Sequence, residues 1–226
     1  MEERKRLILD IIIKDYIATG CPVASSQIVD KYKLPFSSAT VRNEMAELEE
    51  LGLIVQPHTS AGRIPTERAY NLYLEGLSPT EMDKKEKQLL AEAGTDEEGC
   101  KQTAKVLAKL SGLAVVWALH RRYVYYTGLA NLFQQPEFSR HDLVYDISET
   151  IDHLDEIVSD VFDEIDFSPL VKVGQASPFG PFSGTVIFRY KQKKDHAGLV
   201  ALIGPMRMDY EKNLGRLNFL HQLLNN

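Results

Sequence analysis

The amino-acid sequence predicts an α+β protein with two domains. Residues 1–77 show helical periodicity interrupted by turn residues, together with one short pair of strand-like segments. The residues that follow alternate short apolar runs, typical of strands, with amphipathic stretches, typical of helices. Strands and helices in this mixture indicate a sensor-like α+β domain with a mainly antiparallel sheet.

The composition of the 226 residues, 44% apolar and 26% charged, is that of an ordinary globular protein. No stretch approaches the roughly 20 apolar residues that a membrane span requires, and no secretory signal is recognisable. Cys21 and Cys100 lie far apart and neither belongs to a C-x-x-C pair, which argues against a disulfide scaffold or a cysteine-rich zinc site. We therefore expect a cytoplasmic protein without a membrane partner.

The net charge of −6 is concentrated in one segment of the chain. Residues 142–166 hold 10 acidic and no basic side chains, whereas residues 167–226 hold 8 basic and 3 acidic ones. Net charge governs solubility and steering and does not determine the fold. An acidic total therefore leaves room for a local basic surface that meets phosphates.

The N-terminal elements follow from apolar spacing and from glycine, proline and capping residues. Three helices are predicted: residues 4–19, ended by Gly20; residues 25–33, broken by Pro35; and a helix capped by Ser37 or Ser38, with Val41, Met45 and Leu48 inward, ended by Gly52. A strand at 53–57, a turn at 58–62, a return strand from Arg63 and a helix after Thr66 complete the domain. This order of elements is that of a winged helix-turn-helix over residues 1–77.

A linker and a larger domain follow. Ser78-Pro79-Thr80-Glu81 has the pattern of a helix start, with a capping serine and a proline at the first helical position. The helix that it opens is very polar and is interrupted near residue 94, so we interpret 78–99 as a helical linker. In residues 100–226 the pattern predicts helices at 100–111, 147–165 and 209–224 and strands at 113–119, 123–127, 170–173, 185–190 and 199–203.

The third helix carries the strongest functional signal. Its outward positions near the start hold small, hydroxyl, guanidinium and amide groups: Ser38, Ala39, Thr40, Arg42 and Asn43. Such groups suit a DNA major groove, where arginine reads guanine and asparagine reads adenine. The acidic residues come later, where the helix would leave the groove: Glu44, Glu47, Glu49 and Glu50. The alternative is an ordinary exposed helix with a serine cap.

The turn after the third helix is a second candidate contact. It places His58, Thr59, Ser60 and Arg63 at a hairpin tip together with Gly62. An arginine there can enter a minor groove or pair with a phosphate. The alternative is a solvated turn.

The sequence offers little support for an enzyme. It contains no glycine-rich phosphate loop and no G-x-S-x-G elbow, and the six histidines lack metal-ligand spacing. We expect no catalytic residues, no cofactor and no metal. The acidic stretch 147–165 is interpreted as a solvated helix face, with a cation site or an acidic partner surface as the alternative. Arg207 either lines a small pocket or is paired internally at the start of the last helix.

Three stretches of this sequence resemble the heat-inducible transcription repressor HrcA family. The first is Ser37–Leu53 (SSATVRNEMAELEELGL) continued by Gln56–Thr66 (QPHTSAGRIPT). The second is Asn131–Phe138 (NLFQQPEF) and the third is Ile203–Tyr210 (IGPMRMDY). The first match is long and highly specific, and the three together span most of the chain.

The resemblance implies a winged-helix domain joined to a GAF-like domain. It implies a homodimeric repressor of heat-shock or chaperone operons that binds an inverted-repeat operator of the CIRCE type and is kept active by a GroEL-type chaperonin. The DNA-binding residues expected from the two motifs are Ser37, Ser38, Thr40, Arg42, Asn43, His58, Thr59, Ser60 and Arg63.

One departure from the family pattern concerns a dimerising domain that HrcA chains carry inside the GAF-like part. Here Leu119 is separated from Tyr126 by only a few residues, so the inserted domain is expected to be absent and the GAF-like domain, over residues 100–226, to be reduced. A dimer then needs another apolar surface, for which Tyr123, Tyr125 and Tyr126 are candidates. Alternatively, these tyrosines cover their own sheet.

Two other functions remain open from the sequence. One is a ligand-sensing winged-helix regulator of other genes, in which the reduced GAF-like domain binds a small molecule. The other is a protein-interaction module whose winged helix does not bind DNA.

Overall fold

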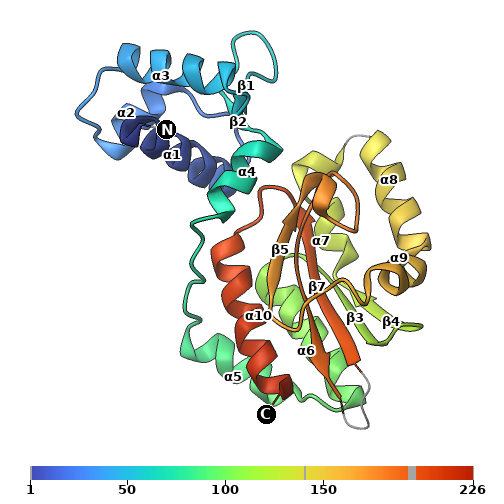
Figure 1. Cartoon of the computed structure of the whole chain (residues 1–226). Coiled ribbons are helices and arrows are strands. Elements are labelled where there is room, and N and C mark those ends of the chain that lie inside the picture. Colours follow the sequence, from blue (N-terminus) through green and yellow to red (C-terminus); the bar gives the residue numbers. More distant parts are fainter. Residues whose placement is uncertain (1, 140, 193–196, 226) are drawn as a thin grey trace. The chain divides into compact units, whose positions relative to one another are not determined.

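The computed structural model describes residues 2–139, 141–192 and 197–225. The chain divides into two compact units, Met1–Leu77 and Ser78–Asn226 (Figure 1). Within the described residues, no helix is both long and apolar enough to cross a membrane.

The first unit contains four helices and a two-stranded hairpin. The elements are α1 (Glu3–Thr19), α2 (Ser25–Tyr32), α3 (Ser38–Glu50), β1 (Ile54–Val55), β2 (Ile64–Pro65) and α4 (Glu67–Leu74). Helix α1 ends at Gly20, which adopts a left-handed conformation and donates its N–H to the Tyr16 carbonyl at 2.8 Å. The strands are antiparallel, with Ile54 opposite Pro65. The core between the helices is formed by Ile8, Leu9, Ile12, Ile28, Val41, Leu48 and Tyr70.

The second unit is built on a five-stranded sheet in the order β4-β3-β7-β6-β5, in which every pair is antiparallel. The strands are β3 (Ala114–His120), β4 (Tyr123–Thr127), β5 (Leu170–Val173), β6 (Ser183–Lys191) and β7 (Ala197–Pro205). The helices are α5 (Lys84–Ala93), α6 (Glu97–Ser111), α7 (Leu129–Phe133), α8 (His141–Asp152), α9 (Leu154–Val161) and α10 (Tyr210–Asn225), with short 3-10 turns η1 (Pro136–Ser139) and η2 (Gly174–Ala176). This arrangement confirms the expected α+β class with an antiparallel sheet and is compatible with a GAF-like domain.

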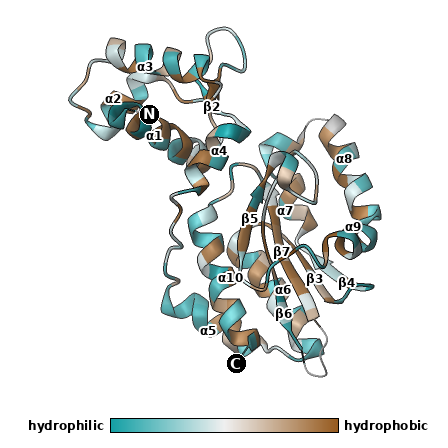
Figure 2. Cartoon of the chain, viewed as in Figure 1, coloured by the Kyte–Doolittle hydropathy of each residue, from teal (hydrophilic) through white to brown (hydrophobic). Residues whose placement is uncertain are grey.

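Helices cover both faces of this sheet, because alternate side chains of the central strands are apolar on each side. One face packs against α7, α8 and α9 in a cluster that includes Val116, Ala201, Leu132, Ile147 and Val158. Helices α6 and α10 cover the other face and pack against β3 and β6. The hydrophobic colouring of the central strands, with hydrophilic residues along α5, reflects this layered core (Figure 2).

The structure corrects the expected helix start at Ser78. Residues 77–83 are not helical, and α5 begins only at Lys84, where the Asp83 side chain accepts the Glu86 N–H at 2.9 Å. The extended segment lies along α10, since the Thr80 N–H donates to the Glu211 carbonyl at 2.9 Å. The backbone of this segment lies so close to α10 that a Cβ at Gly215 would lie 2.0 Å from the Thr80 carbonyl oxygen.

The segment interpreted as a linker therefore belongs to the second unit. Arg216 of α10, with a side chain 9% exposed, donates from Nε and Nη2 to the Glu86 carboxylate of α5 at 3.1 and 2.9 Å. Leu90 of α5 is fully buried. Helix α6 also begins earlier than expected, because Asp96 caps it by accepting the Gly99 N–H at 2.7 Å.

The single helix expected over 147–165 is also wrong, because two helices occupy this stretch. His153 has φ −109° and ψ 18°, which ends α8 and begins α9. The apolar stripe continues across the break, and Ile147 and Leu154 both reach the same core cluster. Periodicity could not reveal the break, since neither proline nor glycine marks it.

Candidate nucleic-acid interface

The first two turns of α3 present small, polar and basic side chains to solvent. Ser37 occupies the N-cap, where its hydroxyl accepts the Thr40 N–H at 3.1 Å and lies 3.0 Å from the Thr40 hydroxyl. The inner face of the helix holds Val41, Met45 and Leu48, all buried as expected. The exposed positions are Ser37, Ser38, Ala39, Arg42, Asn43 and Ala46, with Thr40 half-buried.

Arg42 and Asn43 are the two groups on this surface that can read bases. Both are exposed, and neither side chain forms a hydrogen bond or an ion pair with any residue that the structure describes. The exposed side chain at Ala46, one turn later, is small. A guanidinium and an amide on such a surface can approach base edges closely, the first towards guanine and the second towards adenine.

Three of the four acidic side chains of α3 are paired with basic side chains of the same unit. The pairs are Glu44 with Arg4, Glu47 with Lys5 at 2.6 Å, and Glu49 with Arg63 at 2.9 Å. The hydrogen bond that Lys5 donates to the Glu47 carboxylate raises the pKa of Lys5 above its usual value, which keeps the ammonium charged. The acidic charge of α3 is thus largely balanced, while the charge of Arg42 is not.

Glu44, the first of the acidic residues of α3, lies on the inner face of the helix. Glu44 is 3% exposed and lies between the buried residues Val41 and Leu48 on the inner face of α3. Arg4 of α1 donates to its Oε1, and Lys5 Nζ lies 4.0 Å from its Oε2, which has no hydrogen-bond partner among the described residues. Glu44 therefore holds α3 against α1 and does not face a ligand.

The tip of the hairpin is formed by exposed residues in a tight turn. His58, Thr59 and Ser60 are all exposed. The Ala61 N–H donates to the His58 carbonyl at 3.0 Å, and Gln56 Nε2 donates to the Ala61 carbonyl at 2.9 Å. Ser60 has φ +76°, a conformation that non-glycine residues seldom adopt and that collects at functional sites.

Arg63 lies at the base of the hairpin and not at its tip. Its backbone N–H and carbonyl pair with those of Val23, both at 2.9 Å, and its guanidinium binds Glu49. Gly62 next to it has no room for a side chain, because a Cβ there would lie 2.5 Å from the Val23 carbonyl. The structure thus gathers Ser37 to Asn43 on α3, gathers His58 to Ser60 at the tip, and places Arg63 between the hairpin and the end of α3.

Lys33 is a basic residue that the sequence reasoning did not consider. It follows α2 with φ +48° and is exposed, and its side chain has no hydrogen-bond or ion-pair partner among the described residues. The available signal was its position as the last residue of the second predicted helix, directly before the turn that leads to the third. A lysine in that turn can meet a phosphate beside the groove that α3 enters.

Two of the recognised sequence stretches meet in the second unit. Arg207, between β7 and α10, donates from Nη2 to Gln135 Oε1 at 2.9 Å and to Glu137 Oε2 at 3.1 Å. Its side chain is 14% exposed. Arg207 is therefore paired internally and ties the turn before α10 to η1. Among the described residues, no group of three His, Cys, Asp or Glu side chains is arranged to hold a metal.

The family model described as the HrcA protein C terminal domain matches residues 38–214 of the chain. The heat-inducible transcription repressor HrcA of Desulforudis audaxviator is 43% identical over 122 residues, which cover 51% of this chain and 36% of the relative. The protein of the same name from Geobacter sulfurreducens is 50% identical over 101 residues, 42% of this chain and 30% of the relative. The chain thus matches about a third of the length of these curated relatives.

A solved structure described as that of a hypothetical protein has the same fold. It superposes with a TM-score of 0.81 at 19% sequence identity, and the alignment covers 99% of this chain and 97% of the other. At this level of identity the likeness concerns the fold alone.

Proposed function

The chain belongs to the HrcA family, in a short form, and from this premise we propose that it is a DNA-binding transcriptional repressor. Its targets are heat-shock or chaperone operons, in keeping with the name that its curated relatives carry. It acts in the cytoplasm by occupying an operator and has no enzymatic activity. The observation that carries this proposal is the free, exposed pair Arg42 and Asn43 on α3.

We assign the first unit as a winged helix-turn-helix with α3 as its recognition helix. The order of three helices, hairpin and helix supports this assignment, as does the serine cap that orders the start of α3. In this arrangement Arg42 and Asn43 meet base edges in the major groove. Ser37, Ser38, Thr40 and Lys33 meet the sugar–phosphate backbone around the start of the helix.

The hairpin is the wing of this domain and contacts DNA beside the major groove. His58, Thr59 and Ser60 are its exposed tip. Arg63 at its base exchanges Glu49 for a DNA phosphate on binding. This exchange costs little, because Glu49 is 36% exposed and partly exposed ion pairs contribute only about 0–1 kcal/mol.

The second unit serves as a reduced GAF-like domain that holds two copies together. One recognition helix covers one half-site, so an inverted-repeat operator of the CIRCE type requires a dimer. Strands β3 and β4 are joined by only Arg121 and Arg122, where longer family members carry the inserted dimerising domain. Tyr126, 44% exposed on the edge strand β4, offers contact area with a polar edge for a replacement interface.

A GroEL-type chaperonin is a further proposed partner, which keeps the repressor active. Affinity for the operator measured with and without purified chaperonin tests it. We expect tighter binding in its presence, and equal binding in both would contradict it.

Binding to a two-fold symmetric operator tests the main proposal, with light scattering at micromolar protein to establish the oligomeric state. The expected result is a homodimer that protects two half-sites about 10 base pairs apart or a multiple of this distance. Failure to distinguish operator from random DNA would instead favour the protein-interaction module. Binding at one half-site by a strict monomer would contradict the dimer alone.

A further inference from the structure

Residues 78–83, which lead from the first unit into α5, form a strap along α10. The Thr80 N–H donates to the Glu211 carbonyl of α10 at 2.9 Å, and Met82 is buried. The strap and α10 both belong to the second unit, so their contact does not depend on the arrangement of the two units. The chain that leaves the first unit is thus held by the last helix of the second.

Gly215, inside α10, provides the space for the strap. A Cβ at this position would lie 2.0 Å from the Thr80 carbonyl oxygen, and the three nearest heavy atoms outside α10 all belong to Thr80. Glycine inside a helix costs about 0.5–1 kcal/mol relative to alanine. Since α10 alone would be more stable with alanine, the contact with the strap is what requires glycine here.

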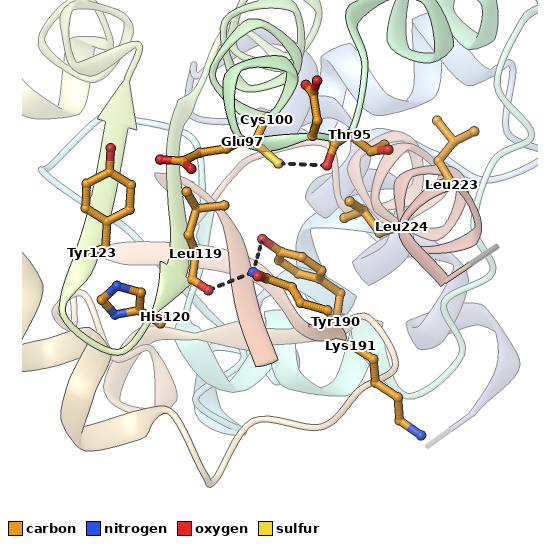
Figure 3. Close-up of a pocket in the computed structure, with 12 residues that line it drawn as sticks. Thr95, Glu97, Cys100, Leu119, His120, Tyr123, Tyr190, Lys191, Leu223 and Leu224 are labelled. Atoms are coloured by element: carbon orange, nitrogen blue, oxygen red, sulfur yellow. Dashed lines mark hydrogen bonds between the residues drawn. The ribbon is translucent and has the colours of Figure 1, made fainter. Parts of the chain in front are cut away.

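Helix α10 is a firm support for the strap. Its residues Leu217 and Leu220 are fully buried, and the helix packs along β6. A cavity lined by Leu223 and Leu224 lies at the other end of α10, about two turns beyond Gly215 (Figure 3). The strap therefore rests on the well-packed part of the helix.

A bound strap leaves little free chain after the first unit. That unit ends at Leu77, and Thr80 is bound to α10, so Ser78 and Pro79 alone lie between them. Two residues span at most about 7 Å, at about 3.3–3.6 Å per residue. A released strap would free the six residues up to Asp83, which span about 20 Å. Release would therefore lengthen the tether of each copy by about 13 Å.

We propose that the strap limits the reach of each DNA-binding unit and makes the dimer selective for the spacing between two operator half-sites. Gly215 and Thr80 act as positioning residues and contact no DNA. The inference rests on the proposed function, a dimer that places one α3 in each half-site. When one unit is bound, the effective concentration of the other at its half-site depends on whether the tether spans the distance. A short tether therefore requires one spacing, whereas a longer tether tolerates others.

Two substitutions release the strap in different ways. Gly215→Ala removes the space for the Thr80 carbonyl, and Thr80→Pro removes the N–H that the Glu211 carbonyl accepts. Thr80→Ala is the matched control, because it keeps the backbone donor and alters an exposed side chain. Thermal unfolding and light scattering of each full-length variant establish that it is folded and dimeric.

Hydrogen exchange tests the strap itself, without DNA. The amide of Met82, inside the strap, should exchange at least about tenfold faster in Gly215→Ala and in Thr80→Pro than in the wild type, because local opening controls exchange. Thr80→Ala should keep the slow exchange of the wild type. Equal exchange in all four proteins would overturn the role of Gly215 and Thr80 in holding the strap.

A series of operators then tests the spacing. Three added base pairs displace one half-site by about 10 Å, less than the length that release adds to each tether. The wild type and Thr80→Ala should lose affinity about tenfold or more on this operator relative to the preferred spacing, and the two released variants less than about threefold. All four should bind a single half-site equally.

The outcomes separate this inference from the proposed function. Equal dependence on spacing in all four proteins, with the strap released in two of them, would overturn the inference and leave operator binding by the dimer intact. Weaker binding of the released variants to the single half-site would also overturn it, because the substitutions would then act on the DNA-binding unit itself. Failure of the wild type to prefer any two-half-site operator would overturn the proposed function and the inference together.

Discussion

Arg63 of the hairpin and Glu49 of α3 form an ion pair in which the arginine Nε and Nη2 both lie 2.9 Å from Glu49 Oε2. The pair joins the base of the proposed wing to the end of the proposed recognition helix. In the proposed complex with DNA, Glu49 without Arg63 would present a negative charge to the phosphate backbone. Arg63 can therefore orient the hairpin in the free protein and contact the DNA backbone in a complex.

Substitutions of this pair should act on all DNA sequences alike. Arg63→Ala should weaken binding to operator and random DNA equally and reduce the slope of log affinity against log salt by about 1, because one phosphate contact is lost. Glu49→Gln should tighten binding to both, since it removes a repulsive charge and frees Arg63. Fluorescence anisotropy over a salt series measures these effects. An unchanged slope in Arg63→Ala would mean that this arginine only orients the hairpin.

Arg42 and Asn43 should instead determine sequence preference. Arg42→Ala or Asn43→Ala should each reduce the discrimination between operator and random DNA by about 1–3 kcal/mol, the contribution of one bidentate base contact. Glu50→Gln is the matched control, because it alters an exposed side chain at the far end of the same helix. Competition binding measures the ratio of the affinities for operator and random DNA. Equal loss of affinity on both would show that these residues do not read bases.

The contact between α5 and α10 predicts a stability effect. Glu86→Ala leaves the guanidinium of Arg216, 9% exposed, without its carboxylate partner. We expect the free energy of unfolding to fall by about 2–4 kcal/mol. This is slightly less than the usual cost of breaking a fully buried ion pair, about 3–5 kcal/mol. Lys85→Ala, on the exposed side of α5, should change it by less than about 0.5 kcal/mol. Urea unfolding provides the comparison, and equal stability of the two variants would mean that α5 is not held by this pair.

The two cysteines should differ in reactivity. Cys21 is exposed, whereas Cys100 is buried and its pKa is raised to about 11. Because the thiolate is the reactive form, a thiol reagent at mildly alkaline pH should modify only Cys21 rapidly in the folded chain. In denaturant it should modify both Cys21 and Cys100 rapidly. The raised pKa also means that the folded chain holds the proton of Cys100 more tightly than the unfolded chain does. The free energy of unfolding should therefore fall as the pH rises from about 9 towards 11. Rapid modification of Cys100 in the folded chain would contradict its burial.

The sequence was most informative where local signals coincide. Helix α1 ends at Gly20 and helix α3 begins at the Ser37 cap. The exposed positions of α3 followed directly from the burial of Val41, Met45 and Leu48. The strands of the second unit were also predictable, because apolar runs between turns are short there.

Contacts between distant residues could not be predicted in this way. Ser78-Pro79 has the pattern of a helix start, yet its neighbour Thr80 is bound by α10, more than 100 residues later. The burial of Glu44 depends on Arg4, and the position of Arg63 depends on Glu49 and Val23. Periodicity describes one element at a time and contains no information on such pairs.

The most direct test of the central claim is the binding of the wild-type chain and of Arg42→Ala to a two-fold symmetric operator and to a scrambled duplex of equal length, at one salt concentration. We predict that the wild type prefers the operator by about 10³-fold or more. Arg42→Ala should lose about 1–3 kcal/mol of that preference while keeping most of its affinity for the scrambled duplex. Equal affinity of the wild type for both duplexes would contradict the assignment of α3 as a recognition helix.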